Sequence, residues 1–170
     1  MNIIKEFNNY ISLVEESLDS PVDISWEFNT NEIFGYFSVD DKKYRIEFLK
    51  QIGNNWSYSF SYLSENSWSY NITHSGVSGF SVLSTIKSGL YEMYKNFNPN
   101  SIIFSAIDNS NSRKRLYKSF CQDFCQVNSL NFSNRGDDHH QIFLMFRNDL
   151  ESNEKEEIML SVKKIIEIGK

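Results

Sequence analysis

The sequence predicts a mixed α+β fold, in which a central, mostly antiparallel twisted sheet carries helices on both faces within a single domain. Three observations support this fold class. Residues 22–74 form short runs in which apolar and polar residues alternate, as in antiparallel strands. After residue 79 the apolar residues recur every three or four positions, as in helices. Residues 101–107 contain the continuous apolar run Ile102-Ile103-Phe104, which is typical of a central strand covered on both faces.

Charge and composition exclude several classes of protein. The net charge of −5 argues against a nucleic-acid partner, because such proteins normally carry a basic surplus. No apolar run approaches the ~20 residues that cross a bilayer, so we predict no membrane association. The N-terminus lacks the order of charged and apolar residues found in a signal peptide, which predicts a cytoplasmic protein. Its 170 residues match one domain with its own core.

The first half of the chain is predicted to be a helix followed by strands. Residues 1–18 have the apolar spacing of an amphipathic helix, which the sequence Asp19-Ser20-Pro21 ends. Residues 22–74 then form antiparallel strands, with a tight turn at Asp40-Asp41. The predicted strands are Val22–Phe28, Ile33–Val39, Tyr44–Phe48, Trp56–Tyr62 and Trp68–Thr73, with a loop at Leu63–Ser67.

Aromatic side chains are predicted to gather on one face of this sheet. They are Trp56, Tyr58, Phe60, Tyr62, Trp68 and Tyr70, and serines alternate with the first four. Such a face is either a platform on which bases stack or a surface buried under the terminal helices. We predict burial, because those helices need an apolar surface to cover.

The second half is predicted to be a strand–helix core, residues 76–147, followed by a C-terminal helix at 154–168. A long helix follows Gly79 and stops at Asn98-Pro99, and the buried strand 101–107 comes next. A further helix carries Cys121 and Cys125 on one face, where we predict reduced, buried thiols. Residues 127–132 and 141–146 are predicted to close the sheet as a hairpin. No spacing typical of a zinc site is present, so no metal is predicted.

The turn Gly76-Val77-Ser78-Gly79 is the first candidate site. Glycine there permits a positive φ and a close approach of phosphate, and the free N–H groups of the next helix would face that phosphate. The alternative is an ordinary turn between a strand and a helix. His74 lies beside this turn and is a candidate base, because its pKa is near neutrality. Glu47 and Glu65 are the other candidate bases.

Two motifs resemble those of the GNAT superfamily of acyl-CoA-dependent N-acyltransferases, over about residues 55–147. Gly76 and Ser78 match the small residues of its pyrophosphate loop, Gln/Arg-x-x-Gly-x-Gly/Ala, although Thr73 replaces the Gln or Arg. A second motif of the family resembles Asn-x-x-Ala-x-x-Leu-Tyr. Asn109, Ser112, Leu116 and Tyr117 match it with one residue more between the asparagine and the leucine.

This resemblance implies acetyl-CoA as a cofactor, bound by Gly76, Val77, Ser78, Gly79, Asn109 and Arg113. It implies that Tyr117 is the general acid that protonates the departing CoA thiolate; alternatively, Tyr117 only packs its ring on the sheet. Arg113 belongs to a basic cluster with Lys114 and Arg115, which either contacts the CoA phosphates or is a solvated face.

Two functions follow from the resemblance. One is transfer of an acetyl group from acetyl-CoA to an amine. The other is a catalytically silent, GNAT-like protein that binds a protein partner. We favour it because the chain is small and acidic, because Thr73 replaces the Gln or Arg, and because the helices that shape the family's acceptor pocket are absent. The stretch Ser112-Arg113-x-x-Leu116-Tyr117 also resembles small proteins of tailed phages. That similarity implies a phage accessory or host-directed protein, present in the host cytoplasm or the virion.

Overall fold

We analysed the protein in a computed structural model, which describes residues 21–70, 77–107, 111–136 and 140–168. The predicted helix at residues 1–18 lies outside these ranges. The strands are β1 (Ser25–Phe28), β2 (Glu32–Val39), β3 (Lys42–Lys50), β4 (Asn55–Ser64), β5 (Ser67–Ser69), β6 (Ser101–Ile107), β7 (Asn131–Gly136) and β8 (His140–Phe146). The helices are α2 (Val77–Phe97), α3 (Asn111–Val127) and α4 (Ser152–Ile168).

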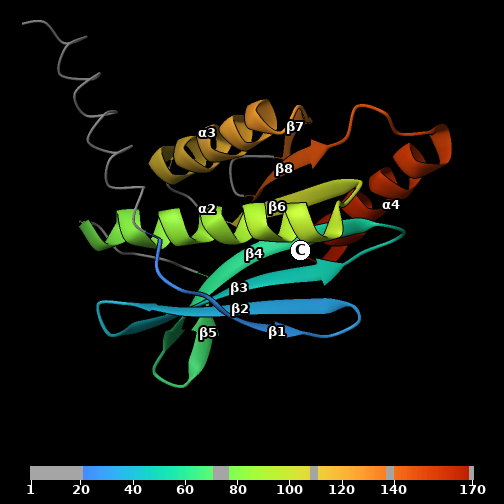
Figure 1. The fold of residues 1–170 in the computed structure, drawn as a ribbon. Helices are drawn as coiled ribbons and strands as arrows, with labels where there is room; N and C mark the ends of the chain where they lie inside the picture. Colours follow the sequence, from blue (N-terminus) through green and yellow to red (C-terminus); the bar gives the residue numbers. More distant parts are fainter. Residues whose placement is uncertain (1–20, 71–76, 108–110, 137–139, 169–170) are drawn as a thin grey trace, which may run out of the picture. The chain divides into compact units, whose positions relative to one another are not determined.

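The described strands form one mixed sheet in the order β1-β2-β3-β4-β6-β8-β7, and β5 pairs with β4 (Figure 1). β4 and β6 are parallel, whereas β6 pairs antiparallel with β8, and β8 antiparallel with β7. The predicted mixed fold with a mostly antiparallel sheet is therefore confirmed. Contacts among the described residues cluster into two compact units. The first is drawn from 21–27, 35–46 and 60–96, and the second from 28–34, 47–59 and 97–168.

In the first unit, the ring of Trp26 is held between two glycines. A Cβ atom at Gly35 would lie 2.6 Å from the indole, and one at Gly89 would lie 2.7 Å from Ile46. The absence of these Cβ atoms lets α2 pack closely against the strands. The indole N–H also donates a hydrogen bond of 3.0 Å to Glu92 on α2. Glycine is therefore needed in β2 and in α2 for packing, not for a turn.

Two hairpin turns of the first unit show why its strands reverse where they do. Asp40 and Asp41 have φ angles of 50° and 61°, which is the left-handed conformation of a tight hairpin turn. This confirms the predicted turn. Glu65, with φ 54°, forms part of a second tight turn, because β4 continues to Ser64 and Ser64 pairs with Ser67. The loop predicted at Leu63–Ser67 is therefore wrong: most of it is the hairpin between β4 and β5.

This second hairpin also places Trp68 on a different face from the one predicted. Trp68 lies opposite Leu63, so the two side chains project from the same face of the sheet. Phe60 and Tyr62 project from the other face. The Arg45 guanidinium lies 4.5 Å from the centre of its ring, and the ring of Tyr36 lies 6.1 Å away. The aromatic face predicted from Trp56 to Tyr70 is thus two faces. Trp56, Tyr58 and Phe60 are buried as predicted, but the C-terminal helix does not cover them, because α4 packs on the Ile103 face, opposite to Phe104 and Tyr58.

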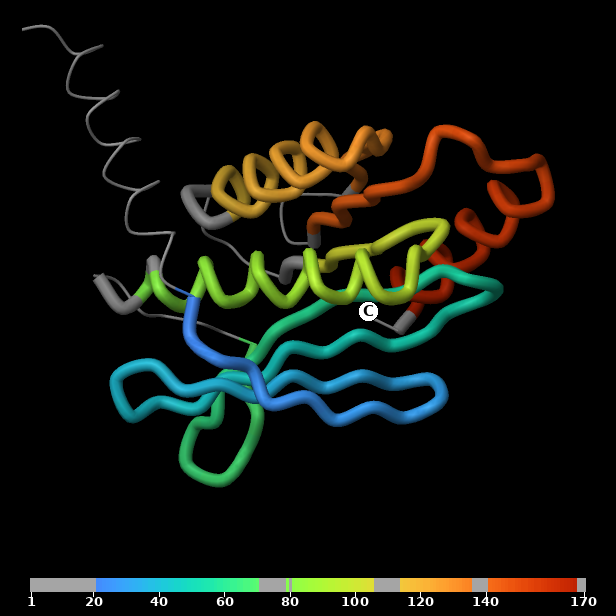
Figure 2. Tube along the Cα trace, viewed as in Figure 1, coloured from blue at the N-terminus to red at the C-terminus, as the bar shows by residue number. Residues whose placement is uncertain are grey.

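In the second unit, helices cover both faces of β6 and β8, as predicted (Figure 1). On one face, α4 packs over Ile103, Ile142 and Leu144 through Ile158 and Val162. On the other face, Tyr117 of α3 contacts Phe104. Figure 2 traces the chain from β6 through α3 to β7 and back along β8. β8 thus lies between β6 and β7. The second strand of the predicted closing hairpin pairs with β6, and the first strand forms the edge of the sheet.

The bounds of that hairpin differ from the prediction. Helix α3 extends to Val127, whose side chain is exposed, and β7 begins only at Asn131. The turn between them contains Ser129 with a φ of 54°. Its carbonyl oxygen accepts a hydrogen bond from the Asn148 side chain, 2.6 Å away. Residues 127–132, predicted as one strand, thus contain the end of α3, a turn and the start of β7.

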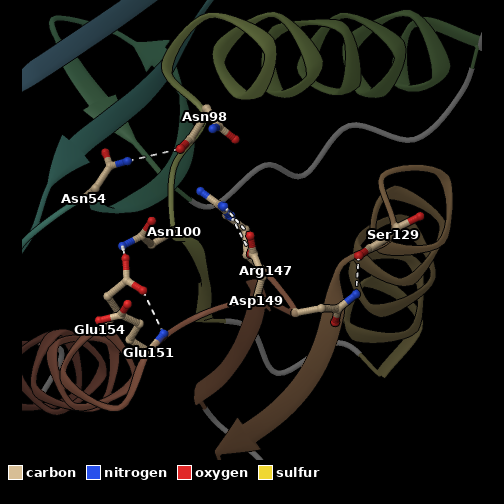
Figure 3. Close-up of polar contacts among 9 residues, drawn as sticks. Asn54, Asn98, Asn100, Ser129, Arg147, Asp149, Glu151 and Glu154 are labelled. Atoms are coloured by element: carbon tan, nitrogen blue, oxygen red, sulfur yellow. Dashed lines mark hydrogen bonds and ion pairs between the residues drawn. The ribbon is translucent and has the colours of Figure 1, made fainter.

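Asparagine side chains join the ends of several elements of the second unit (Figure 3). Asn54 donates to the carbonyl of Asn98 at 3.1 Å, and Asn100 donates to Glu154 at 2.9 Å. The other carboxylate oxygen of Glu154 accepts from the backbone N–H of Glu151 at 2.8 Å, which caps α4. Part of the asparagine content of the chain therefore connects strands and helices through side-chain hydrogen bonds.

Candidate functional site

The centre of the candidate site is the point where the pairing of β4 with β6 ends. The parallel register runs from Asn55 opposite Ser101 to Tyr58 opposite Phe104. Both strands continue, because β4 extends to Ser64 and β6 extends to Ile107. From Ser105 onward, the partner of β6 in the described register is β8. Beyond the shared register, β4 pairs with β5 from Tyr62 to Ser64.

A ladder of aromatic rings crosses the sheet at this level. Its members lie on five different strands, and all of them belong to the second unit. In strand order they are Phe48, Tyr58, Phe104, Phe143 and Phe132, with distances between successive ring centroids of 4.7, 5.6, 6.0 and 6.4 Å. Such distances are typical of favourable ring contacts. The ladder makes the end of the β4–β6 pairing a rigid surface on the α3 side.

Tyr117 lies against the middle of this ladder. Its ring meets that of Phe104 edge-on, at 87° and with centroids 5.3 Å apart. Phe104 is the last residue of β6 that is in register with β4, so the half-buried ring of Tyr117 marks the end of the pairing. The ring of Tyr117 therefore packs on the sheet, and its role as an acid stays a prediction.

The next turn of α3 contributes Cys121 to the same buried face. Burial, and secondly the neighbouring Cys121 thiol, raise the pKa of Tyr58 well above its usual value. Burial likewise raises the pKa of Cys121 well above its usual range, and that of Cys125 to about 12. Both cysteines are free and buried, as predicted. Thiols that remain protonated at neutral pH are poor nucleophiles and poor metal ligands.

Glu47 is the buried carboxylate on the other face of the sheet. It is 5% exposed and lies in β3 between Ile46 and Phe48. Phe48 stacks on Tyr58, so alternation places Glu47 on the opposite face, next to the strand position of Ser59. The backbone hydrogen bond from the Gln51 N–H to the Asn55 carbonyl is consistent with this alignment of β3 and β4, in which Glu47 lies opposite Ser59. Glu47 thus lies close to the end of the β4–β6 pairing, across the sheet from Tyr117.

Only some of the predicted site residues lie in the described part of the chain. His74, Gly76 and Asn109 lie outside the described residues, as does Thr73. Val77 and Ser78 are the first residues of α2, and Gly79 follows in its first turn. Gly79 is not among the described residues with a positive φ, so the prediction of a glycine turn through residue 79 is wrong at its last positions. The reason is that the helix starts at Val77, three residues earlier than predicted.

The remaining predicted residues lie on α3 and in the β4–β5 turn. Arg113 is in the first turn of α3, and that turn contains no acidic residue. Glu65 is exposed in its turn, as expected for a solvated charge. The residues that the sequence did not single out as part of the site are Tyr58 and Phe104. Their alternating and buried patterns were visible, but only the parallel register shows that they end the same pairing.

Neither a cluster of metal ligands nor a membrane span is found among the described residues. No group of three or more His, Cys, Asp or Glu side chains in the described ranges could hold a metal ion. None of the helices in the described part of the chain is both long and apolar enough to span a bilayer.

Comparison with known proteins adds one finding. No protein-family model matches the sequence, and no curated protein matches it. Among solved structures, the chain is similar to the N-acetyltransferase PseH of Campylobacter jejuni, with a TM-score of 0.40 and 11% sequence identity. The similarity covers 87% of this chain and 84% of that one.

Proposed function

We propose that the protein is an acyl-CoA-dependent N-acyltransferase with a GNAT-like fold. One observation carries the proposal: the pairing of parallel strands β4 and β6 ends at Tyr58 and Phe104, where Tyr117 lies edge-on against Phe104. The resemblance of the sequence implies an opening between two central strands and a tyrosine beside it. The strand order, with β8 next to β6, agrees with that layout.

In the proposed reaction, one residue donates a proton to the leaving group and another removes a proton from the acceptor amine. The amine nitrogen of the acceptor attacks the carbonyl carbon of the thioester, and the bond between that carbon and sulfur breaks. Tyr117 donates its hydroxyl proton to the departing sulfur, because the sulfur leaves more readily as a neutral thiol than as a thiolate anion. A base must remove a proton from the amine. We assign this role to the buried carboxylate of Glu47, acting directly or through water.

The hydrophobic surroundings favour this assignment. The Phe104 ring excludes water from one side of Tyr117, so proton transfer there would compete less with solvent. The sequence-based expectation that residues 76–79 hold the pyrophosphate of the donor stays a prediction. So does the contact of Asn109 and Arg113 with the donor.

Acetyl-CoA binding is the first test. A ligand that binds only the folded state stabilises it by about 2.7 kcal/mol at 100 times its Kd. We expect acetyl-CoA to raise the melting temperature in a thermal unfolding scan. ADP serves as the control, since it shares the adenine and the pyrophosphate but lacks the thioester arm, and should have a smaller effect. No shift at millimolar acetyl-CoA would contradict the proposal.

Transfer is the second test. Release of free CoA thiol should rise when a panel of small amines and amine-bearing peptides is added to the protein with acetyl-CoA. A stabilising effect of acetyl-CoA without release of thiol for any amine would instead favour the catalytically silent protein, which acts by binding a partner. The two outcomes separate the two hypotheses without knowledge of the natural acceptor.

A further inference from the structure

We propose that the exposed face of α4 binds the same face of a second copy of this chain, so that two antiparallel α4 helices form a weak twofold dimer. This inference goes beyond the proposed acyl transfer and does not rest on it. The residues that carry it all lie in the second unit. They are Glu156, Met159, Leu160 and Lys163, which we call the outer stripe of α4.

The inner face of α4 fixes the direction in which the outer stripe points. Ile158 and Val162 are each 3% exposed and pack in one cluster with residues of β6 and β8. Successive residues of an α-helix are rotated by about 100°, so Glu156 and Lys163 lie almost opposite to that buried side. Met159 and Leu160 lie between the two charges, one on each side of the line that joins them.

The middle of the outer stripe is apolar. Met159 is 44% exposed and Leu160 is 48% exposed, although both side chains are large. Methionine is enriched at protein interfaces, because its flexible thioether adapts to varied surfaces. An apolar pair between charged residues also matches the layout of an interface, in which an apolar centre is surrounded by a polar rim.

The charges of the outer stripe identify a second copy as the occupant. Glu156 comes three residues before Met159, and Lys163 comes three residues after Leu160. If a twofold axis passes between Met159 and Leu160, antiparallel pairing places Glu156 of each copy opposite Lys163 of the other. The apolar side chains then meet around the axis, with one ion pair on either side of them. A surface that complements itself in this way is what an isologous contact requires.

The intrachain partner of Lys163 does not prevent this pairing. The Lys163 ammonium lies 4.0 Å from the Glu167 carboxylate, and the Lys163 side chain is 74% exposed. An exposed ion pair between residues four apart on a helix contributes little to stability. Lys163 can therefore turn toward Glu156 of the other copy at small cost.

The affinity should be low because one helix face is a small contact. Stable complexes bury about 1,200 Å² or more, and a single pair of helices buries less. We expect a dissociation constant between about 10 µM and about 1 mM at low salt. Sedimentation velocity from about 5 µM to about 1 mM should show a monomer that becomes a dimer. A chain that stays monomeric over this range would overturn the inference.

Charge reversal tests whether the outer stripe forms the contact. Glu156→Lys and Lys163→Glu each place like charges opposite one another at two points of the dimer, so each should weaken dimerisation at least about tenfold. Asp123→Lys and Lys118→Glu make the same changes of net charge at exposed positions of α3, and they should leave dimerisation within about twofold of wild type. If the α4 and α3 variants behave alike, the contact is not on α4.

Mixing the two α4 variants tests the antiparallel, twofold arrangement. A dimer of one Glu156→Lys chain and one Lys163→Glu chain brings two lysines of the first chain opposite two glutamates of the second. Both ion pairs are then restored with reversed sign. An equimolar mixture should recover the wild-type dissociation constant to within about threefold, although neither variant dimerises well alone. A mixture that stays monomeric would exclude this arrangement.

The apolar centre has its own variant and control. Leu160→Asp places two charges beside the axis and should abolish dimerisation below about 1 mM. Val127→Asp makes a comparable change on α3, where Val127 is 70% exposed, and should have no effect. All these positions are exposed, so the melting temperatures at low concentration should stay close to that of wild type. Dimerisation of Leu160→Asp with wild-type affinity would overturn the inference, whatever the outcome of the acetyl-CoA experiments.

Discussion

The two faces of β6 are both buried, but they are built from different side chains. The face under α4 is aliphatic, with Ile103 packed against Ile158 and Val162. The face under α3 is aromatic, with Phe104 between Tyr58, Phe143 and Tyr117. Aliphatic side chains contribute buried area alone, whereas tyrosines add hydroxyl groups to rigid rings. The α4 face near Ile103 therefore serves stability, while the α3 face can also carry chemistry.

The largest expected effect belongs to the aliphatic face. Ile103→Ala should lower the free energy of unfolding by about 2–5 kcal/mol, because it leaves a cavity in a well-packed cluster. Urea unfolding measures this loss. Met159→Ala on α4 is the matched control, since Met159 is 44% exposed and its truncation should change stability by less than about 0.5 kcal/mol. A loss below about 1 kcal/mol for Ile103→Ala would show that the cluster collapses around the gap.

The next effect belongs to the aromatic face and concerns rate. Tyr117→Phe keeps the ring that packs on Phe104 but removes the proton donor, so acetyl transfer should fall by about 100-fold or more. The melting temperature and the binding of acetyl-CoA should change little. The matched control is Tyr36→Phe, which removes a hydroxyl bonded to Glu27 in the other unit. Equal rates for Tyr117→Phe and wild type would exclude Tyr117 as the general acid.

A smaller effect tests how α4 is held over the aliphatic face. Gly53 has a φ of 65°, and a Cβ atom there would collide with the carboxylate of Glu157 on α4. Gly53→Ala should therefore destabilise the fold by about 1–2 kcal/mol through backbone strain, and the carboxylate, at the far end of the flexible Glu157 side chain, should move aside at little further cost. In a Glu157→Ala background only the strain should remain. If the substitution costs the same in both backgrounds, the collision contributes nothing.

The smallest effect is a dependence of stability on pH that comes from the Cys125 thiol on α3. Burial raises the pKa of Cys125 to about 12, from 9.0 in the absence of the fold. As the pH rises, the thiol of the unfolded chain therefore loses its proton before that of the folded chain. The contribution of the buried thiol to the free energy of unfolding is complete below about pH 9 and is lost as the pH rises toward about 12. The urea midpoint should fall between about pH 8 and pH 10. Cys125→Ala should make that fall shallower, and an unchanged slope would contradict the assignment.

The local spacing of apolar and turn residues predicted most of the helices and strands, because the same spacing decides which backbone conformation buries the apolar side chains. Alternation of Trp56, Tyr58 and Phe60 identified β4, and the continuous run at Ile102-Ile103-Phe104 identified β6. The aspartate pair at 40–41 identified a turn that requires positive φ. These features depend on neighbours within a few residues, so sequence alone reveals them. The errors fell at ends, at Gly79 and Val127, where helix and strand patterns overlap.

Long-range pairing was not visible in the same way. Trp68 seemed to share a face with Tyr62, but the tight turn at Glu65 reversed its side. The sequence also did not show which earlier strand is the neighbour of β6, a place that β4 takes. Strand register follows from turn geometry and from the partners that a strand meets, and a shift of one residue moves every side chain to the other face.

Hydrophobic period and turn residues were sufficient for the mixed fold class and for the order of strands and helices in the described part, because they act through local backbone preference and burial. The sequence motif also singled out Tyr117 as a candidate. Tertiary packing was needed to establish that β4 and β6 pair in parallel and part after Tyr58 and Phe104, that Tyr117 packs there, and that Glu47 is buried on the opposite face. Those relations join residues tens of positions apart, and they arise when the core as a whole is packed.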